Sequence, residues 1–205
     1  PLTRRSLRVG VVGPNAVLQA YGNYQGNNDN FTTVLDGVRR DFPDSGYAAG
    51  CGMASNDTLG FAAAIAIAQA ADVTVAVMGL DTSQEHETGT RSAIELPGVQ
   101  SALLAQLGRT RTTLVLVLLG GSALAIPEAK RDIDTIVWAG YGGEEAGAAV
   151  ADVLFGRVVP SGRLPITFYE ATDQLAPFAS YDMAGGGRTF RYLRHEPLWY
   201  FGSGL

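Results

Sequence analysis

Apolar runs and helical patterns alternate along the first 170 residues of the chain. Runs that are apolar almost throughout lie at 7–13, 46–49, 73–78, 112–119, 135–139 and 164–169, and helical patterns lie between them at 32–40, 57–71, 99–107, 127–131 and 144–154. Since these runs do not alternate with polar residues, they are typical of strands covered on both faces. The pattern therefore predicts an α/β fold, a three-layer α/β/α sandwich whose mostly parallel sheet has about six strands.

Polar residues and glycines mark the expected ends of these elements. Asn56 and Asp57 are placed to cap the alanine-rich helix that runs to about residue 71. Gly108 suits the end of the helix at 99–107, and acidic residues at 144–145 suit the first turn of the next helix. After residue 170 the periodicity stops, so we expect residues 1–170 to form the sandwich and residues 171–205 an irregular, ordered extension.

A long polar segment, residues 79–98, follows the apolar run at 73–78. Connections in α/β units usually have only about 2–6 residues, and longer ones are often functional. Open α/β sheets bind ligands at the carboxyl ends of their strands, which is where this segment lies. We therefore expect the chemistry of the protein among its charged residues, which are Asp81, Glu85, His86, Glu87, Arg91 and Glu95.

Composition excludes several classes of function. The 205 residues carry a net charge of −5, and the basic residues are scattered, so no nucleic acid is expected as a partner. The longest apolar run, 59–71, is too short to cross a bilayer, so no membrane partner is expected either. The single cysteine, Cys51, excludes an internal disulfide and a cysteine metal cluster.

Other catalytic or cofactor motifs are absent or incomplete. The glycines at 10–13 lack the G-x-G-x-x-G spacing of a dinucleotide site, and residues 120–124 do not form a nucleophile elbow. The two histidines, His86 and His195, belong to no zinc pattern. We therefore expect neither a metal nor a cofactor.

Glu85 and Glu87 are the candidates for acid and base chemistry. Two residues apart, their side chains would point the same way from extended backbone. Repulsion between the two negative charges would then favour a protonated form of one carboxyl group, which a general acid needs, while Arg91 would act in the opposite direction. The alternative is a solvated loop whose charges have no chemical role.

The segment GLDTSQEHETGTRSAIELPGVQSALL resembles a stretch of glycoside hydrolase family 3 that reads roughly G-L-D-x-S-x-E-x-E-x-x-D-R-x-x-L-x-L-P-G-x-Q-x-x-L. The resemblance extends over nearly the whole chain. Further matches are found at 7–15, 22–26 (G-N-Y-x-G), 50–51, 138–144 (W-A-G-Y), 160–165 (P-S-G-R-L-P), 187–192 and 197–205.

The resemblance implies the α/β sandwich domain of a retaining β-glycosidase that removes terminal non-reducing sugars from oligosaccharides. A TIM-like barrel in the same polypeptide would carry the nucleophilic aspartate, and a fibronectin type III-like domain would follow. By motif position, Glu85 corresponds to the general acid/base, with Glu87 as the alternative. Glu87, Arg91 and Asp81 would bind substrate or support the site.

The resemblance also has implications for substrate specificity and for the activity of this chain without the barrel. Two of its motifs favour β-xylosidases, but Thr90 replaces an aspartate and residues 27–30 depart from that branch, so glucosidase or arabinosidase activity stays open. We expect the enzyme to be secreted, with a periplasmic or vacuolar location as the alternative. Without the barrel, this chain should have no glycosidase activity. The rival hypothesis is a non-catalytic sugar-binding or interaction module that retains the fold.

Overall fold

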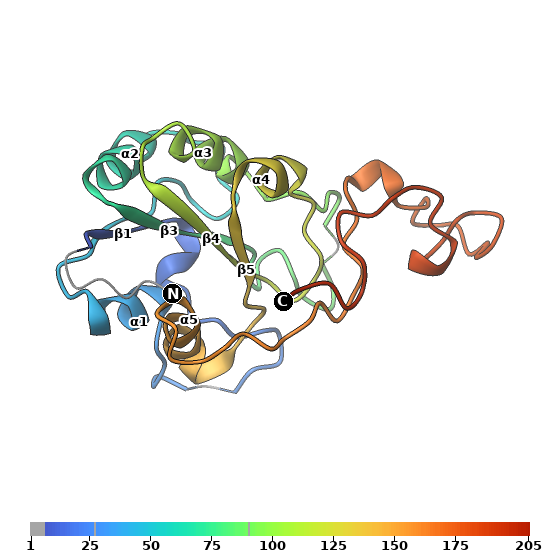
Figure 1. Ribbon diagram of the computed structural model, residues 1–205. Coiled ribbons are helices and arrows are strands. Elements are labelled where there is room, and N and C mark those ends of the chain that lie inside the picture. The colour runs from blue at the N-terminus through green and yellow to red at the C-terminus, as the bar shows by residue number, and fades with distance from the viewer. Residues whose placement is uncertain (1–6, 27, 90) are drawn as a thin grey trace.

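The computed structural model describes residues 7–26, 28–89 and 91–205, so Thr90 and Asn27 lie outside the described residues. A five-stranded parallel sheet in the order β2-β1-β3-β4-β5 forms the centre of the molecule (Figure 1). The strands are β1 (Val9–Val12), β2 (Gly46–Ala48), β3 (Val73–Gly79), β4 (Thr113–Leu119) and β5 (Thr135–Trp138). The helices are α1 (Val34–Asp41), α2 (Phe61–Ala70), α3 (Gln100–Leu107), α4 (Pro127–Asp132) and α5 (Ala146–Leu154).

Helices cover both faces of the sheet, which confirms the predicted α/β/α sandwich. Helices α2, α3 and α4 lie on one face and α1 and α5 on the other (Figure 1). Alternate residues of β4 enter opposite cores, Val115 and Val117 toward α1 and α5, and Leu116 and Leu118 toward α2, α3 and α4. Each such buried side chain contributes about 1.5–3 kcal/mol of hydrophobic stabilisation. Burial on both faces explains why the strands are apolar at almost every position.

The sixth predicted strand, 164–169, does not join the sheet. Its Phe168 instead forms a pair of backbone hydrogen bonds with Trp199 of the extension, at 2.8 and 3.2 Å. Phe168 is buried, and its ring packs edge-on against Trp138 and Trp199 with centroids 5.8 Å away in both cases. Pro165 has no N–H to donate, which makes this segment unsuitable for a sheet interior.

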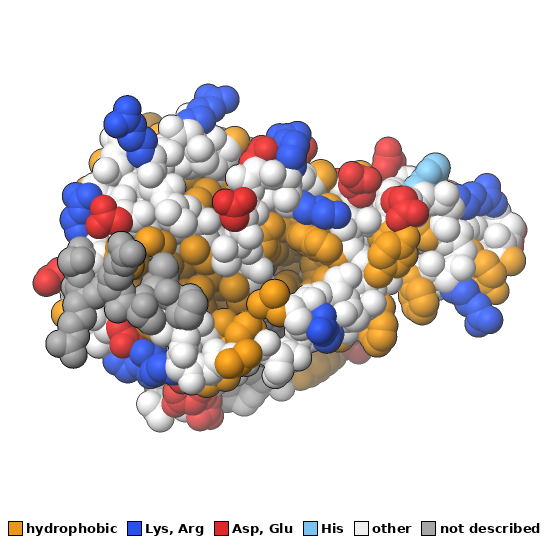
Figure 2. Space-filling model, in the orientation of Figure 1, with side chains coloured by type: hydrophobic (Ala, Val, Ile, Leu, Met, Phe, Trp, Pro, Cys, Tyr) orange, Lys and Arg blue, Asp and Glu red, His pale blue; other side chains and the backbone are white. Residues whose placement is uncertain are grey.

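The C-terminal extension has a docked part and a projecting part. Its last residues pack beside β5, whereas residues between about 175 and 195 project from the body, and hydrophobic side chains gather along this projection (Figures 1 and 2). Phe178, Tyr181 and Phe190 are 77%, 84% and 67% exposed. Whether residue 170 is a domain boundary stays a prediction.

The helix ends agree with the sequence only in part. Gly108 caps the end of α3 as predicted. The prediction for α2 is wrong, because the helix begins after Gly60, while the Asp57 carboxylate accepts a hydrogen bond from Leu59 N at 2.8 Å. Such a local turn competes with a helix cap. The acidic residues at 144–145 lie in a 3₁₀ turn that precedes α5.

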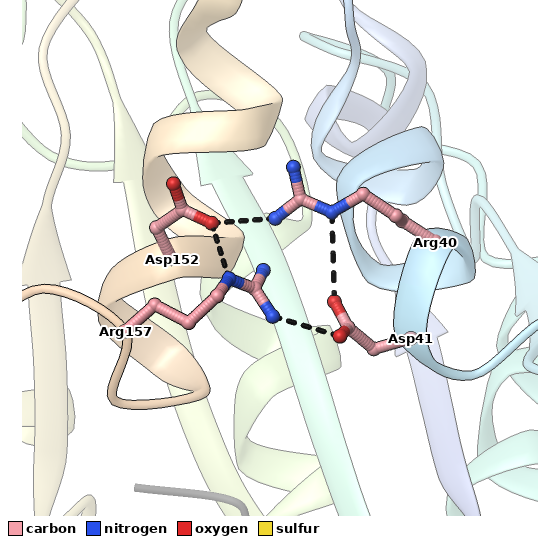
Figure 3. Close-up of polar contacts among 4 residues, drawn as sticks. All are labelled: Arg40, Asp41, Asp152 and Arg157. Atoms are coloured by element: carbon pink, nitrogen blue, oxygen red, sulfur yellow. Dashed lines mark hydrogen bonds and ion pairs between the residues drawn. The ribbon is translucent and has the colours of Figure 1, made fainter.

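The ends of α1 and α5 are joined by an ion-pair ring, which we define as Arg40, Asp41, Asp152 and Arg157 (Figure 3). Asp152 Oδ1 lies 2.5 Å from Arg40 Nη2 and 2.6 Å from Arg157 Nε. Asp41 completes the ring, 2.7 Å from Arg157 Nη1 and 3.7 Å from Arg40 Nε.

Within the described residues, no helix combines the length and the apolar character that crossing a membrane requires.

Candidate active site

The strands end at a common edge where the backbone must turn within very little space. Gly13 follows β1 with φ 120°, and Gly79 ends β3 with φ 135°, a conformation that favours glycine. A Cβ atom on Gly13 would lie 2.0 Å from Val77 O, and one on Gly79 would lie 1.9 Å from Leu119 O. These two glycines therefore allow the loops after β1 and β3 to leave the sheet side by side.

Two buried amide side chains fix the start of the loop after β3. Gln100 accepts a hydrogen bond from Gly79 N at 2.8 Å and donates to Gly79 O at 2.9 Å and to Met53 O at 2.7 Å. Asn15, from the loop after β1, donates to Leu80 O at 2.9 Å. Both amides are 0% exposed. The loop that carries the candidate carboxylates thus begins from a rigid base.

Asp81 shapes the next turn of the loop. Its carboxylate accepts hydrogen bonds from Ser83 N at 2.8 Å and Ser83 Oγ at 2.6 Å, and its carbonyl accepts from Glu85 N at 3.0 Å. These bonds within the loop use Oδ1 and the carbonyl oxygen of Asp81. Asp81 therefore supports the conformation of the loop.

Glu85 lies at the centre of a group that we call the Glu85 network, with Gly121, Ser122, Tyr141 and Arg91. Gly121 N and Tyr141 OH donate to Glu85 Oε2 at 2.8 and 2.6 Å, and Ser122 Oγ donates to Glu85 Oε1. Arg91 Nη2 donates to Ser122 Oγ at 2.7 Å. The network joins the loops that follow β3, β4 and β5.

Partial burial affects two members of this network. Burial raises the pKa of the Tyr141 hydroxyl strongly, and its hydrogen bond to Glu85 raises it further, so Tyr141 stays a proton donor. Burial lowers the pKa of the Arg91 guanidinium, while the charge of Glu85 acts in the opposite direction. Arg91 Nη1 is buried and has no hydrogen-bond partner within the described residues.

Glu87 has different surroundings from Glu85. The chain does not continue through Glu87 in extended backbone as predicted, because Gly89 N donates to His86 O at 3.2 Å and closes a tight turn around Glu87. Glu85 is partly buried, whereas Glu87 is exposed, and no hydrogen bond joins its side chain to any described residue. The prediction that the two carboxylates point the same way is therefore wrong.

The far end of the loop is tied to the C-terminal extension. Thr172 donates to the Glu95 carboxylate from its backbone N at 3.0 Å and from Oγ1 at 2.6 Å. Burial raises the pKa of Glu95, but these hydrogen bonds outweigh it and lower the pKa overall.

A cavity of about 650 Å³ lies between Arg91 and the extension, with Tyr169, Phe178 and Arg188 in its wall.

The sequence predicted that Glu85 and Arg91 lie at this edge, but it did not predict three of their hydrogen-bond partners. Gly121, Ser122 and Tyr141 were considered only as parts of motifs. Their signal is position, because they follow β4 and β5 directly and thus reach the same edge as the loop after β3. Among the residues that the structure describes, no group of three or more His, Cys, Asp or Glu side chains could hold a metal ion.

Comparison with known families gives a match over the whole chain. The model described as "Glycosyl hydrolase family 3 C-terminal domain" matches residues 1–205. Beta-D-xylosidase 1 of Arabidopsis thaliana is 39% identical, over 98% of this chain and 27% of the relative. Beta-xylosidase/alpha-L-arabinofuranosidase 1 of Medicago sativa is 34% identical, over all of this chain and 28% of the relative.

Solved structures share the fold over the whole chain. A GH3 exo-β-xylosidase in complex with a xylobiose aziridine activity-based probe superposes with a TM-score of 0.93 at 30% identity, over 100% of this chain and 28% of that one. A β-glucosidase of Listeria innocua in complex with isofagomine gives a TM-score of 0.84 at 25% identity, over 100% of this chain and 30% of that one. The chain thus spans somewhat over a quarter of the length of these similar proteins.

Proposed function

Because this chain belongs to glycosyl hydrolase family 3, as the C-terminal domain of that family, we propose that it contributes the general acid/base to a retaining, exo-acting β-glycosidase. The observation that carries the proposal is an acidic loop held rigidly at the carboxyl edge of the sheet, with one carboxylate anchored and another exposed two residues later. Such a loop can present a carboxyl group to a sugar bound outside this edge.

The proposed reaction needs a second carboxylate from elsewhere in the polypeptide. In retaining hydrolysis, a nucleophile attacks the anomeric carbon while an acid protonates the leaving oxygen, and the same group then deprotonates the water that releases the sugar. The two carboxyl groups must lie about 5–5.5 Å apart. We assign the nucleophile to a barrel domain, since the relatives are several times longer than this chain. The 205-residue chain alone should then be inactive.

The contacts favour Glu87 over Glu85 as the acid/base, which reverses the preference drawn from motif position. An acid/base must exchange its proton with the substrate, so it needs an oxygen that faces the substrate. Both oxygens of Glu85 already accept hydrogen bonds from neighbouring loops. Glu87 is exposed and lies at the tip of the turn, so it is available to a sugar held by another domain.

The names of the similar proteins favour a β-xylosidase or β-glucosidase, and the relatives from Arabidopsis thaliana and Medicago sativa both carry the name β-xylosidase. A non-catalytic module is the rival hypothesis. The exposed, rigidly based acidic loop favours the enzyme, because a module that binds without chemistry does not need a carboxylate there.

The test is hydrolysis of nitrophenyl β-xyloside and β-glucoside by the complete polypeptide that contains this chain. Glu87→Ala should cut turnover by about 10²–10⁴-fold, and azide should restore it with a β-glycosyl azide as product. Asp134→Ala, an exposed acid at the opposite edge of the sheet, is the control and should stay fully active. Azide rescue of Glu85→Ala instead would move the role to Glu85, and an inert wild type would favour the non-catalytic module.

A further inference from the structure

We propose that the Glu85–Tyr141 hydrogen bond is a positioning device, which sets the acid/base loop in its productive place and takes no part in proton transfer itself. The inference deepens the proposed function and rests on it. Glu85 and Tyr141 come from the loops after β3 and β5, and their oxygen atoms lie 2.6 Å apart. Their contact therefore links the carboxylate loop to the far strand of the sheet.

The Tyr141 ring is itself held in place on two sides. A Cβ atom added to Gly121 would lie 3.2 Å from Tyr141 Cε2, and one added to Gly22 would lie 3.5 Å from Cδ2. The ring thus packs beside backbone from the loops after β1 and β4, and the contact is tighter at Gly121 than at Gly22. A hydroxyl on a ring fixed in this way offers a precise point of attachment for Glu85.

The donors around Glu85 explain why this contact fixes position. They are one backbone N–H and two hydroxyl groups, and no arginine or lysine forms an ion pair with Glu85 within the described residues. Hydrogen bonds to a charged acceptor are short and directional, and three donors from the two loops after β4 and β5 define the orientation of one carboxylate. Arg91 orients Ser122 in turn through a bond of 2.7 Å.

A displacement of the loop should affect only the steps that need the acid/base. Misplacing a catalytic group by about 1 Å can cost roughly 10²-fold in rate. Cleavage of a glycoside with a poor leaving group needs the proton, whereas dinitrophenolate leaves without one. The ratio of kcat/KM values for these two substrates therefore reports the placement of the acid separately from overall folding.

The experiment measures this ratio in Tyr141→Phe of the complete polypeptide, with xylobiose and dinitrophenyl β-xyloside as substrates. We expect kcat/KM for xylobiose to fall about tenfold and that for the dinitrophenyl glycoside to change less than about twofold. Azide should give no rescue, because Glu87 is still present. Tyr200→Phe removes a Tyr–Glu hydrogen bond of the same kind in the extension, to Glu196, and should leave the ratio unchanged.

Other outcomes separate the inference from the proposed function. If Tyr141→Phe lowers kcat/KM equally for both substrates, or leaves the ratio of the two kcat/KM values unchanged, Tyr141 has only a structural role and the inference is overturned. If Tyr141→Phe does not fold, Ser122→Ala provides the same test, since it removes a different donor to Glu85. Formation of glycosyl azide by Glu85→Ala would overturn the positioning role. Wild type that hydrolyses neither substrate would overturn the proposed function instead.

Discussion

The ion-pair ring between α1 and α5 and the Glu85 network at the carboxyl edge both join segments far apart in the sequence, but they use different kinds of bond. In the ring, two guanidiniums and two carboxylates cancel one another's charge. In the Glu85 network, one carboxylate is held by an N–H and two hydroxyl groups, and the only cation, Arg91, bonds to Ser122.

Solvent acts differently on these two regions. The side chains of the ring are 30–47% exposed, so water and salt compete with every contact. Exposed ion pairs of this kind usually add little to stability. The hydroxyl of Tyr141 is shielded enough for burial to dominate its pKa, so losing its partner leaves a polar group without a substitute. The ring joins two helix ends at the surface of the molecule, whereas the Glu85 network holds one carboxylate in a defined orientation.

The largest effect on stability should follow from removing the Glu85 carboxylate, which lies at the centre of the Glu85 network. The 205-residue chain has a core on both faces of its sheet, so its unfolding can be measured directly. Glu85→Ala should lower the free energy of unfolding by about 2 kcal/mol, because the partly buried donors at Tyr141 and Ser122 lose their charged acceptor. Urea unfolding checks this value, with Glu87→Ala as the control. A loss as small as that of Glu87→Ala would contradict the anchoring role.

Elements with a local apolar pattern could be predicted from the sequence, whereas contacts between residues far apart in the sequence could not. Strands such as β3 and β4 are recognisable because both faces are covered and nearly every residue is apolar. The segment at 164–169 has a similar composition, but Pro165 and its pairing with Trp199 keep it outside the sheet. That pairing involves residues more than thirty positions away, which no local pattern reveals.

The sequence predicted that Glu85 and Arg91 lie at one edge of the sheet, but it did not predict which groups they contact. The long acidic loop follows a buried strand, so the sequence predicts its place at the carboxyl edge of the sheet, and Glu85 and Arg91 do share a contact there through Ser122. Which carboxylate is anchored depends on Ser122 and Tyr141, which arrive from other strands. The exposed Glu87 and the partly buried Glu85 differ in their tertiary contacts, which the spacing of the two residues in the sequence could not show.

A smaller effect should follow from opening the ion-pair ring. Arg157→Gln keeps most of the side chain but removes the charge that Asp41 and Asp152 share. The urea midpoint of the 205-residue chain should fall slightly at low salt, and the difference from wild type should vanish near about 1 M salt, where surface charges are screened. Arg109→Gln, an exposed arginine at the end of α3, is the control. The loss in Glu85→Ala should persist at both salt concentrations.

The smallest effect concerns the pH dependence of the ring. Hydrogen bonds from Arg157 and Arg40 lower the pKa of Asp152 in the folded chain, although burial acts slightly in the opposite direction. A carboxyl group with a lowered pKa stabilises the fold above its unfolded pKa of about 3.9, and this contribution is lost as pH falls through the lower, folded value.

Asp152→Asn should therefore be slightly less stable than wild type at neutral pH, and the two should converge as the pH falls below about 4. Urea midpoints measured across this range check the convergence, with Asp134→Asn as the control, since Asp134 forms no ion pair in the described part of the chain. A difference that stays constant down to acid pH would mean that Asp152 acts through packing. The ring would then resemble the Glu85 network more closely than its exposure suggests.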